Sequence, residues 1–313
     1  MPEAPGRPPE DPAVGVDVGG TTVKVGALSA DGTVAGERSV PVAGVPQLST
    51  VLDGVAAAVD ELTGGRPLSG LGVGMPGLID RAAGRVEESP NLPVFNGARL
   101  ADELGRRLSL APETVVLEND ANVAALGEAR LGAARGARNA LVVTLGTGVG
   151  GGVILDGKLR VGAGLAGEIG HVTVDPDGLP CGCGSTGCLE TLASATAARR
   201  RALDAGLPPE DPGSLEQLTE RAEAAAGPER ALLHAIGVDL GHGLATALCL
   251  LDVRTFVFGG GFSAALDLLK DGIRAGLTEW AYGDRVREVR LVRAELGPAA
   301  GWIGAAHLPS SRP

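Results

Sequence analysis

The chain has 313 residues and a formal net charge of −11, with 44% hydrophobic and only 2% aromatic residues. This length suffices for two domains or one large domain with a sizeable core, and the hydrophobic content excludes a disordered chain. The acidic charge argues against binding to nucleic acid. No apolar run approaches the roughly eighteen residues of a membrane span.

Residues 1–12 (MPEAPGRPPEDP) lack the apolar segment of a signal peptide, so we expect a flexible tail and a soluble cytoplasmic α/β protein. In the first half of the chain, short β-rich segments alternate with helical ones. The predicted elements are strands and turns over 14–40, with a hairpin at Asp31-Gly32, a helix over 47–62, a strand over 71–74, a helix over 100–108, a strand over 114–117 and a helix from ENDAN (118–122) to about 131.

The opening pattern returns in the middle of the chain. Residues 139–162 (NALVVTLGTGVGGGVILDGKLRVG) repeat the strand, glycine turn, strand, Asp-Gly hairpin and strand found after residue 14. Two copies of one unit predict two similarly folded lobes. Each glycine turn lets backbone N–H groups converge on an anion, so two such turns facing one cleft would hold a polyphosphate from both sides.

The second half is predicted to be mostly helical. It contains an irregular stretch at 174–187, a helix over 189–203, a loop over 207–213 (LPPEDPG), helices over 215–226 and 229–250, a strand over 255–258, a helix over 264–277 and a small-residue helix over 298–307.

Neither glycine turn matches a known dinucleotide-binding or P-loop pattern in full. GTGVGG (146–151) matches GxGxxG, but a strand and hairpin follow it instead of the helix that a dinucleotide site requires. No Walker A loop is present. In the first copy, Asp17 precedes the turn and Lys24 ends it; the carboxylate would hold Mg²⁺ through water, while Gly19, Gly20, Thr21 and Thr22 donate to phosphate oxygens. An ordinary hairpin is the alternative for one copy alone, and the second copy favours phosphate.

The polar run ENDAN lies where a strand becomes a helix. Such junctions direct side chains to the carboxyl edge of a sheet, where Asp120 could remove the proton from an attacking hydroxyl. The alternative is a helix cap, because Asn and Asp are common there.

The cysteines form the most specific pattern. His171, Cys181, Cys183 and Cys188 supply one imidazole and three thiols within eighteen residues, the ligand set of a tetrahedral structural Zn²⁺ site. Disulfide pairing is the competing interpretation, but three clustered cysteines leave one unpaired and nothing marks the chain as secreted. Cys249, inside ATALCLL, is predicted to be a buried core thiol.

Two carboxylates flank the metal pattern. Glu168 precedes His171 by three residues, and Glu190 follows Cys188 by two. A zinc-bound imidazole offers its other nitrogen as a donor. Together with Asn and Asp side chains, these groups suit a polyol, whose hydroxyls each need a donor and an acceptor. Solvation at the surface is the alternative for each glutamate.

Together these motifs resemble the ROK family (repressors, open reading frames and sugar kinases), and most of all its bacterial ATP-dependent glucokinases. The resemblance extends from about residue 14 to 307 and is carried by DVGGTTVK, GMPG, ENDANVAALGEARLGAARG, LGTGVGGG, AGEIGH, CGCGSTGCLE and FGGGF. It implies the actin-like, hexokinase-type ATPase fold, in which two lobes with duplicated, hairpin-containing mixed sheets flanked by helices close over the sugar. The lobes would be 13–121 and 122–297, with 298–313 packing back towards the first.

The resemblance also implies roles for single residues. Asp120 matches the catalytic base for the sugar hydroxyl. The implied sugar-binding residues are Asn91, Asn119, Glu168, His171 and Glu190, with Gly77 near the sugar; the phosphate turns are Gly19, Gly20 and Thr21, and Gly146, Thr147 and Gly148; the turn near adenosine is Gly259, Gly260 and Gly261; and the zinc ligands are His171, Cys181, Cys183 and Cys188.

The implied function is transfer of the γ-phosphoryl group of Mg-ATP to the 6-hydroxyl of a hexose, with glucose as the expected acceptor and glucose 6-phosphate as product. Alternatives are an N-acetylmannosamine, N-acetylglucosamine or fructose kinase, or a non-catalytic sugar-sensing protein; some relatives use polyphosphate as donor. A homodimer or homotetramer is expected. The repressor branch carries an N-terminal helix-turn-helix, and only a short tail precedes the first strand here, so DNA binding is not expected.

Overall fold

The computed structural model describes residues 12–45, 47–207 and 215–311. Two compact units make up the chain: unit 1 runs to Arg130 and includes the segment from Pro298, and unit 2 comprises Leu131–Gly297. The division falls after Arg130 and not after residue 121, because helix α3 (Asp120–Leu131) packs closely on α9 (Ala300–Ala306) of unit 1. The expected tail (1–12) and loop (207–213) lie outside the described residues, apart from their end residues Pro12 and Leu207.

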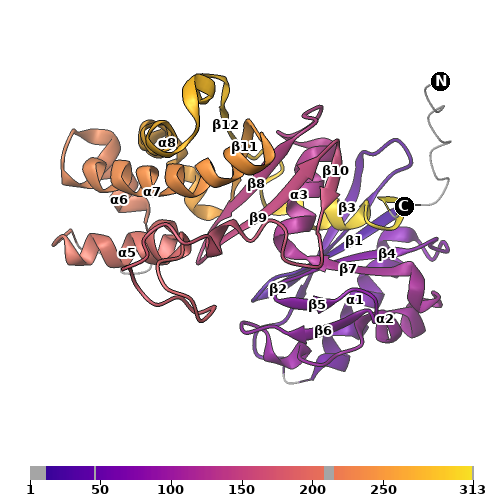
Figure 1. Cartoon of the computed structure of the whole chain (residues 1–313). Coiled ribbons are helices and arrows are strands. Elements are labelled where there is room, and N and C mark those ends of the chain that lie inside the picture. Colours follow the sequence, from indigo (N-terminus) through magenta and orange to yellow (C-terminus); the bar gives the residue numbers. More distant parts are fainter. Residues whose placement is uncertain (1–11, 46, 208–214, 312–313) are drawn as a thin grey trace, which may run out of the picture. The chain divides into compact units, whose positions relative to one another are not determined.

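Unit 1 is built on a five-stranded sheet with the order β3-β2-β1-β4-β7 (Figure 1). The first three strands are antiparallel, whereas β4 and β7 continue the sheet parallel to β1. Parallel neighbours need crossover segments, and these contain α1 and α2. The elements of unit 1 are β1 (Ala13–Val18), β2 (Thr22–Leu28), β3 (Val34–Pro41), α1 (Leu48–Thr63), β4 (Leu71–Met75), β5 (Leu78–Asp80), β6 (Arg85–Glu88), α2 (Leu100–Leu108), β7 (Val115–Asn119), α3 (Asp120–Leu131) and α9 (Ala300–Ala306).

The C-terminal helix α9 packs on this sheet where the strands carry glycine. A Cβ on Gly15 of β1 would lie 1.9 Å from the Trp302 carbonyl oxygen, and one on Gly26 of β2 would lie 2.2 Å from the Trp302 indole ring. A Cβ on Gly72 of β4 would lie 1.7 Å from the backbone of α9. Trp302 is fully buried, and its Nε1 donates to Glu37 Oε2 at 2.6 Å. The missing side chains of three neighbouring strands therefore make the space for α9.

Unit 2 has a second five-stranded sheet, with the order β10-β9-β8-β11-β12. As in unit 1, the hairpin strands are antiparallel and two further strands continue the sheet in parallel, which confirms the two similar lobes predicted from the repeat. Asp156 and Gly157 both have positive φ, as a two-residue hairpin turn requires. The elements of unit 2 are β8 (Ala140–Leu145), β9 (Val149–Leu155), β10 (Lys158–Arg160), α4 (Glu190–Ala193), α5 (Ala195–Asp204), α6 (Glu216–Ala224), α7 (Pro228–Leu251), β11 (Thr255–Gly259), α8 (Leu266–Trp280) and β12 (Arg290–Arg293).

Helices α7 and α8 lie side by side in unit 2 (Figure 1). They touch through glycines: a Cβ on Gly237 would lie 2.4 Å from the Leu269 carbonyl oxygen, and one on Gly276 2.2 Å from that of Val238. Among the described residues, α7 alone is long and apolar enough to cross a membrane, but 56% of its most apolar window is buried in the protein. Packing in the core of unit 2 thus accounts for its apolar composition.

Two local predictions were wrong. The single helix expected over 189–203 is two helices, because Ser194 adopts an extended conformation and its Oγ accepts the Ala197 N–H at 3.0 Å as the N-cap of α5. Cys249 is exposed rather than buried. The inward face of α7 near its end is formed by Leu244, Ala245 and Leu248, so the following residues turn towards solvent.

Candidate active site

The turn between β1 and β2 contains the first set of residues predicted to bind phosphate. Its backbone is closed by a hydrogen bond from Gly19 N to Thr22 O at 3.0 Å. Gly20 and Thr21 are exposed at the tip. A Cβ on Gly20 would meet nothing within 4 Å, and its φ lies outside the left-handed region. Neither packing nor backbone conformation within the chain requires glycine at position 20. The open space at its Cβ position leaves room for a ligand to approach the backbone.

Asp17 is the second-last residue of β1, just before this turn, and pairs with Lys24 across the hairpin. Its carboxylate lies against α9, since a Cβ on Gly301 would lie 2.3 Å from Oδ2. Burial and the charge of Asp120 raise the pKa of Asp17 to about 7, while Lys24 opposes the shift. Lys24 Nζ donates to the Pro298 carbonyl oxygen at 3.0 Å. A cation near Asp17 would therefore stabilise a carboxylate that is otherwise only partly ionised at neutral pH.

Asp120 begins α3 immediately after β7, in the strand-to-helix junction that the sequence predicted. Its Oδ1 accepts the Ala121 N–H at 2.9 Å, and Asn119 Oδ1 accepts the same N–H at 2.9 Å. Both side chains are half-buried, and burial raises the pKa of Asp120. The capping interactions of the alternative interpretation are thus present, and they are compatible with the predicted role of Asp120. Because Asp120 influences the pKa of Asp17, unit 1 brings the predicted base and the predicted magnesium-binding carboxylate together.

Glu118, the other carboxylate of ENDAN, has a structural role. It is 4% exposed, accepts two hydrogen bonds from the Arg81 guanidinium and accepts the Asn122 Nδ2–H at 3.0 Å. This pairing braces the junction that carries Asp120. Asn91 is exposed in the turn after β6, and Gly77 has a φ of 108°, where a Cβ would lie 2.2 Å from the Glu88 carbonyl oxygen.

In unit 2 the turn between β8 and β9 is held by neighbouring elements. Gly146 N donates to Gly148 O at 3.0 Å, and the Gly146 carbonyl accepts the Ala195 N–H at 2.8 Å. Thr196 Oγ1 donates to the Thr147 carbonyl oxygen at 2.8 Å. A Cβ on Gly146 would meet nothing within 4 Å. The start of α5 therefore fixes this turn while its outer surface stays open.

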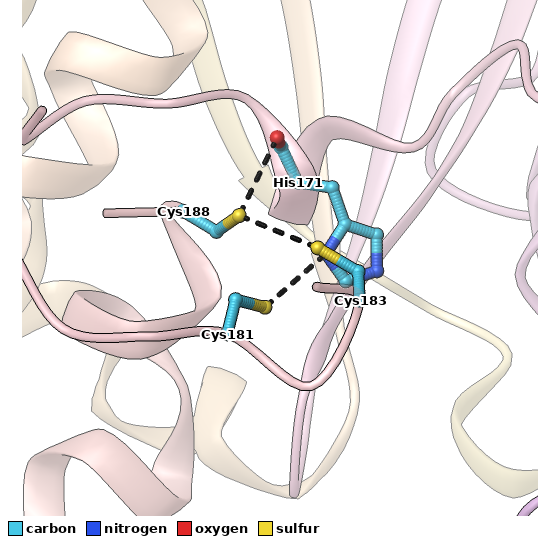
Figure 2. A group of neighbouring side chains, drawn as sticks. All are labelled: His171, Cys181, Cys183 and Cys188. Atoms are coloured by element: carbon cyan, nitrogen blue, oxygen red, sulfur yellow. Dashed lines mark hydrogen bonds between the residues drawn. The ribbon is translucent and has the colours of Figure 1, made fainter. Parts of the chain in front are cut away.

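The four predicted metal ligands converge in unit 2 (Figure 2). Their ligand atoms all lie within 4.8 Å of one another; Cys181 Sγ is 3.7 Å from His171 Nδ1, and Cys183 Sγ is 3.7 Å from Cys188 Sγ. A tetrahedron with metal–sulfur distances of about 2.3 Å has edges of about 3.8 Å. The donor set and its spacing therefore fit a tetrahedral Zn²⁺ ion. No disulfide links these cysteines.

Both flanking glutamates lie beside this cluster. The 3₁₀ turn Ile169–His171 places His171 Nε2 3.9 Å from Glu168 Oε2, while Nδ1 faces the cysteine sulfurs. Glu190 is the first residue of α4, and its Oε2 accepts the Val149 N–H at 2.9 Å. The cluster thus orients the imidazole towards Glu168 and fixes the chain that carries Glu190.

A pocket of about 800 Å³ in unit 2 begins at the same glycine turn. Gly261 lines it and has open space at its Cβ position, whereas Gly260 has a φ of 82° and is pressed against the Leu145 backbone. No sequence motif predicts the other polar lining residues, because only the fold brings them together: Arg199, Glu216, Thr219 and Glu220, from α5 and α6.

Comparison with known proteins places these features in a family. The model of the ROK family matches residues 13–312. The chain belongs to the ROK family. A glucokinase of Streptomyces coelicolor is 36% identical, with 94% of this chain and 96% of that protein covered. The N-acetylgalactosamine kinase AgaK of a Shewanella species is 32% identical, with 94% and 95% covered.

A solved ROK structure is equally similar along its whole length. The ROK glucokinase of Streptomyces griseus, in complex with glucose and AMPPNP, has 35% sequence identity and a TM-score of 0.75, covering 95% of this chain and 98% of that one. This likeness confirms the predicted ROK fold class. The sequence-predicted site residues are divided between the units: Asp17, Asn91, Asn119 and Asp120 belong to unit 1, and Gly146, Glu168, His171 and Glu190 to unit 2.

Proposed function

We propose that this ROK protein is a hexose kinase that transfers the γ-phosphoryl group of ATP to the 6-hydroxyl of glucose. The observation that carries the proposal is Asp120, a half-buried carboxylate at the β7–α3 junction whose pKa is raised by burial and which lies near Asp17. A general base works best when its pKa approaches the working pH. The 36% identity to a glucokinase over nearly the whole chain supports glucose as the acceptor.

In the proposed reaction, the sugar O6 forms a bond to the γ-phosphorus while the bond from that phosphorus to the β–γ bridging oxygen breaks. ADP leaves, and Asp120 accepts the O6 proton. Asn91, Asn119, Glu168, His171 and Glu190 would hold the other sugar hydroxyls, since carboxylates and amides accept from hydroxyls while an imidazole N–H donates to them. Positioning and electrostatics, rather than covalent chemistry, supply most of the rate in phosphoryl transfer.

The open glycine positions support a nucleotide site. Gly20 and Gly146 carry no Cβ where the chain itself has space for one, so phosphate oxygens can approach the backbone of both turns closely. The pocket that continues from Gly146 to Gly261 fits the adenosine, with Arg199 and Glu216 able to contact the base or ribose. Mg²⁺, held near Asp17, would neutralise charge on the phosphates.

The zinc ion is proposed to be structural. His171, Cys181, Cys183 and Cys188 would occupy all four positions of a tetrahedral ion, so no open position remains for a substrate. What these residues do for the reaction is orient the His171 imidazole beside Glu168 and hold the chain that leads to Glu190.

Replacement of the base tests the proposal directly. Asp120→Asn should lower kcat by about 10²–10⁴-fold while leaving glucose affinity nearly unchanged, as measured by a coupled ADP-release assay and calorimetry. Asp102→Asn is the matched control, because Asp102 also lies in the first turn of a helix of unit 1, and it should keep wild-type turnover. Near-normal kcat in Asp120→Asn would reject the assignment.

A kinase for an N-acetylated amino sugar is the second candidate, favoured by the 32% identity to the Shewanella enzyme. The ADP-release assay on glucose, N-acetylglucosamine, N-acetylmannosamine, N-acetylgalactosamine and fructose separates the candidates by kcat/KM. Binding of a sugar without any turnover would instead indicate a sugar sensor. Replacing ATP by polyphosphate in the same assay identifies the donor.

We further propose a cytoplasmic protein that binds neither nucleic acid nor membrane and forms a homodimer or homotetramer. The net charge of −11 and the burial of α7 support the first part. Light scattering coupled to size exclusion measures the oligomeric state, and a monomeric mass would reject the second part.

A further inference from the structure

Glu190 occupies the space that a side chain at position 148 would need. A Cβ built on Gly148 would lie 2.2 Å from Glu190 Oε2 and 3.1 Å from its carboxyl carbon. The same oxygen accepts the N–H of the next residue, Val149, at 2.9 Å. The carboxylate is therefore seated on the glycine turn itself, although it comes from helix α4, which directly follows the metal cluster.

The backbone does not explain the glycine at this position. Gly148 has no φ in the left-handed region, so any residue could adopt its conformation. Gly146, in the same turn, has open space at its Cβ position. What an added methyl group at position 148 meets within the chain is the Glu190 carboxylate, which makes that carboxylate the physical reason for a glycine there.

We propose that Gly148 is a positioning residue for Glu190, fixing the carboxylate that binds the sugar; this rests on the proposed function. The missing Cβ leaves room for the carboxylate, and the Val149 N–H fixes its Oε2. The turn assigned to the nucleotide phosphates is thereby in contact with the sugar-binding carboxylate. Because coupling between two binding sites is reciprocal, a ligand that shifts this turn changes sugar affinity, and sugar binding changes nucleotide affinity equally.

The substitution Gly148→Ala tests the proposal without unfolding the protein. The group that must move is the free end of a flexible, half-buried side chain, so the melting temperature should remain close to that of the wild type. The displaced carboxylate loses its hydrogen bond and its position. Glucose Kd, measured by calorimetry without nucleotide, should therefore rise about tenfold or more, since a hydrogen bond to a charged group is lost.

Two further variants separate positioning from other effects. Gly146→Ala adds a methyl group to the same turn without touching Glu190, and its glucose Kd without nucleotide should equal the wild-type value. In a Glu190→Ala background, Gly148→Ala should weaken glucose binding no further, because the carboxylate through which it acts is gone. An unchanged Kd in Gly148→Ala, or an equal loss in both backgrounds, would overturn the proposal.

The experiment also distinguishes this inference from the kinase assignment. A protein that binds glucose without phosphorylating it contradicts the kinase, yet the cycle still tests Gly148 because it measures binding alone. Normal turnover with additive losses in the cycle contradicts the role of Gly148 and leaves the kinase intact. The double-mutant cycle of Gly148→Ala and Glu190→Ala uses whichever of the five sugars in the ADP-release assay binds tightest. If none of the five sugars binds, both proposals are overturned.

Discussion

The two units share a strand order, but the carboxylate beside the glycine turn has a different origin in each. In unit 1 it is Asp17, which belongs to the strand that enters the turn and faces Lys24. In unit 2 it is Glu190, which comes from a helix after the metal cluster and accepts the Val149 N–H. The repeated supersecondary unit thus sets where the turns lie, whereas the carboxylates beside the turns come from different elements in the two units.

The two units also differ in what packs beside the sheet and its glycine turn. Unit 1 seats α9 in the space left by glycines of three strands, and no group of three or more clustered metal-ligating side chains is found among its described residues. Unit 2 has the Cys and His cluster beside its turn. Close helix packing therefore covers the sheet of unit 1, whereas unit 2 adds a loop whose Cys and His side chains fit a metal ion. Each arrangement has its own vulnerable residues.

Loss of the metal cluster should have the largest effect. Cys188→Ala removes a ligand that is fully buried, and because metal affinity is coupled to folding, the free energy of unfolding should fall by about 3–5 kcal/mol. Hydrogen exchange should show the loss at β9 and α4 of unit 2, with β1 of unit 1 protected as before. Cys249→Ala is the control: this exposed thiol lies outside the cluster and should change stability by less than about 0.5 kcal/mol.

Equal bound zinc in the wild type and Cys188→Ala, measured by elemental analysis, would contradict the role of the cluster. Equal loss of protection from exchange in both units would contradict the expectation that the cluster stabilises unit 2 alone.

Crowding of the α9 interface should be the next largest effect. Gly15→Ala places a methyl group 1.9 Å from the Trp302 carbonyl oxygen, where backbone must move, so the free energy of unfolding should fall by about 1–3 kcal/mol. Denaturant titration measures it. Gly20→Ala, with open space at its Cβ position, should keep wild-type stability. The same stability loss in both variants would show that close packing on α9 is not the cause.

The smallest expected effect is on the pH dependence of stability. The folded-state pKa of Asp17 is raised to about 7 from a usual value of 3.8, so the folded protein holds a proton that the unfolded chain releases. Stability should therefore fall as pH rises from about 4 to about 7 and then level off. Asp17→Asn should flatten this slope and stabilise the ligand-free protein at pH 8, as measured by denaturant midpoints. An unchanged slope would contradict the raised pKa.

Much of the candidate site was predictable because it consists of local patterns. The cysteine spacing indicated the cluster, and ENDAN placed Asp120 at a strand-to-helix junction, since both depend on short-range geometry. Arg199, Thr219 and Glu220 were not predictable, because surface residues of amphipathic helices carry no motif and enter the pocket only through packing. Cys249 was placed in the core wrongly for a similar reason: its neighbours are apolar, but the direction in which α7 turns at its end decides exposure.

The amino-acid sequence by itself determined the repeated strand-turn-strand unit, the ligand set of the metal cluster and the family to which the chain belongs. These follow from spacing and residue type, which act over a few neighbouring positions. The tertiary structure decided that the charge of Asp120 raises the pKa of Asp17, that α9 fills the glycine positions of unit 1 and that Glu190 rests on Gly148. Such contacts join residues far apart in the chain, and burial and packing arise only when the folded backbone brings them together.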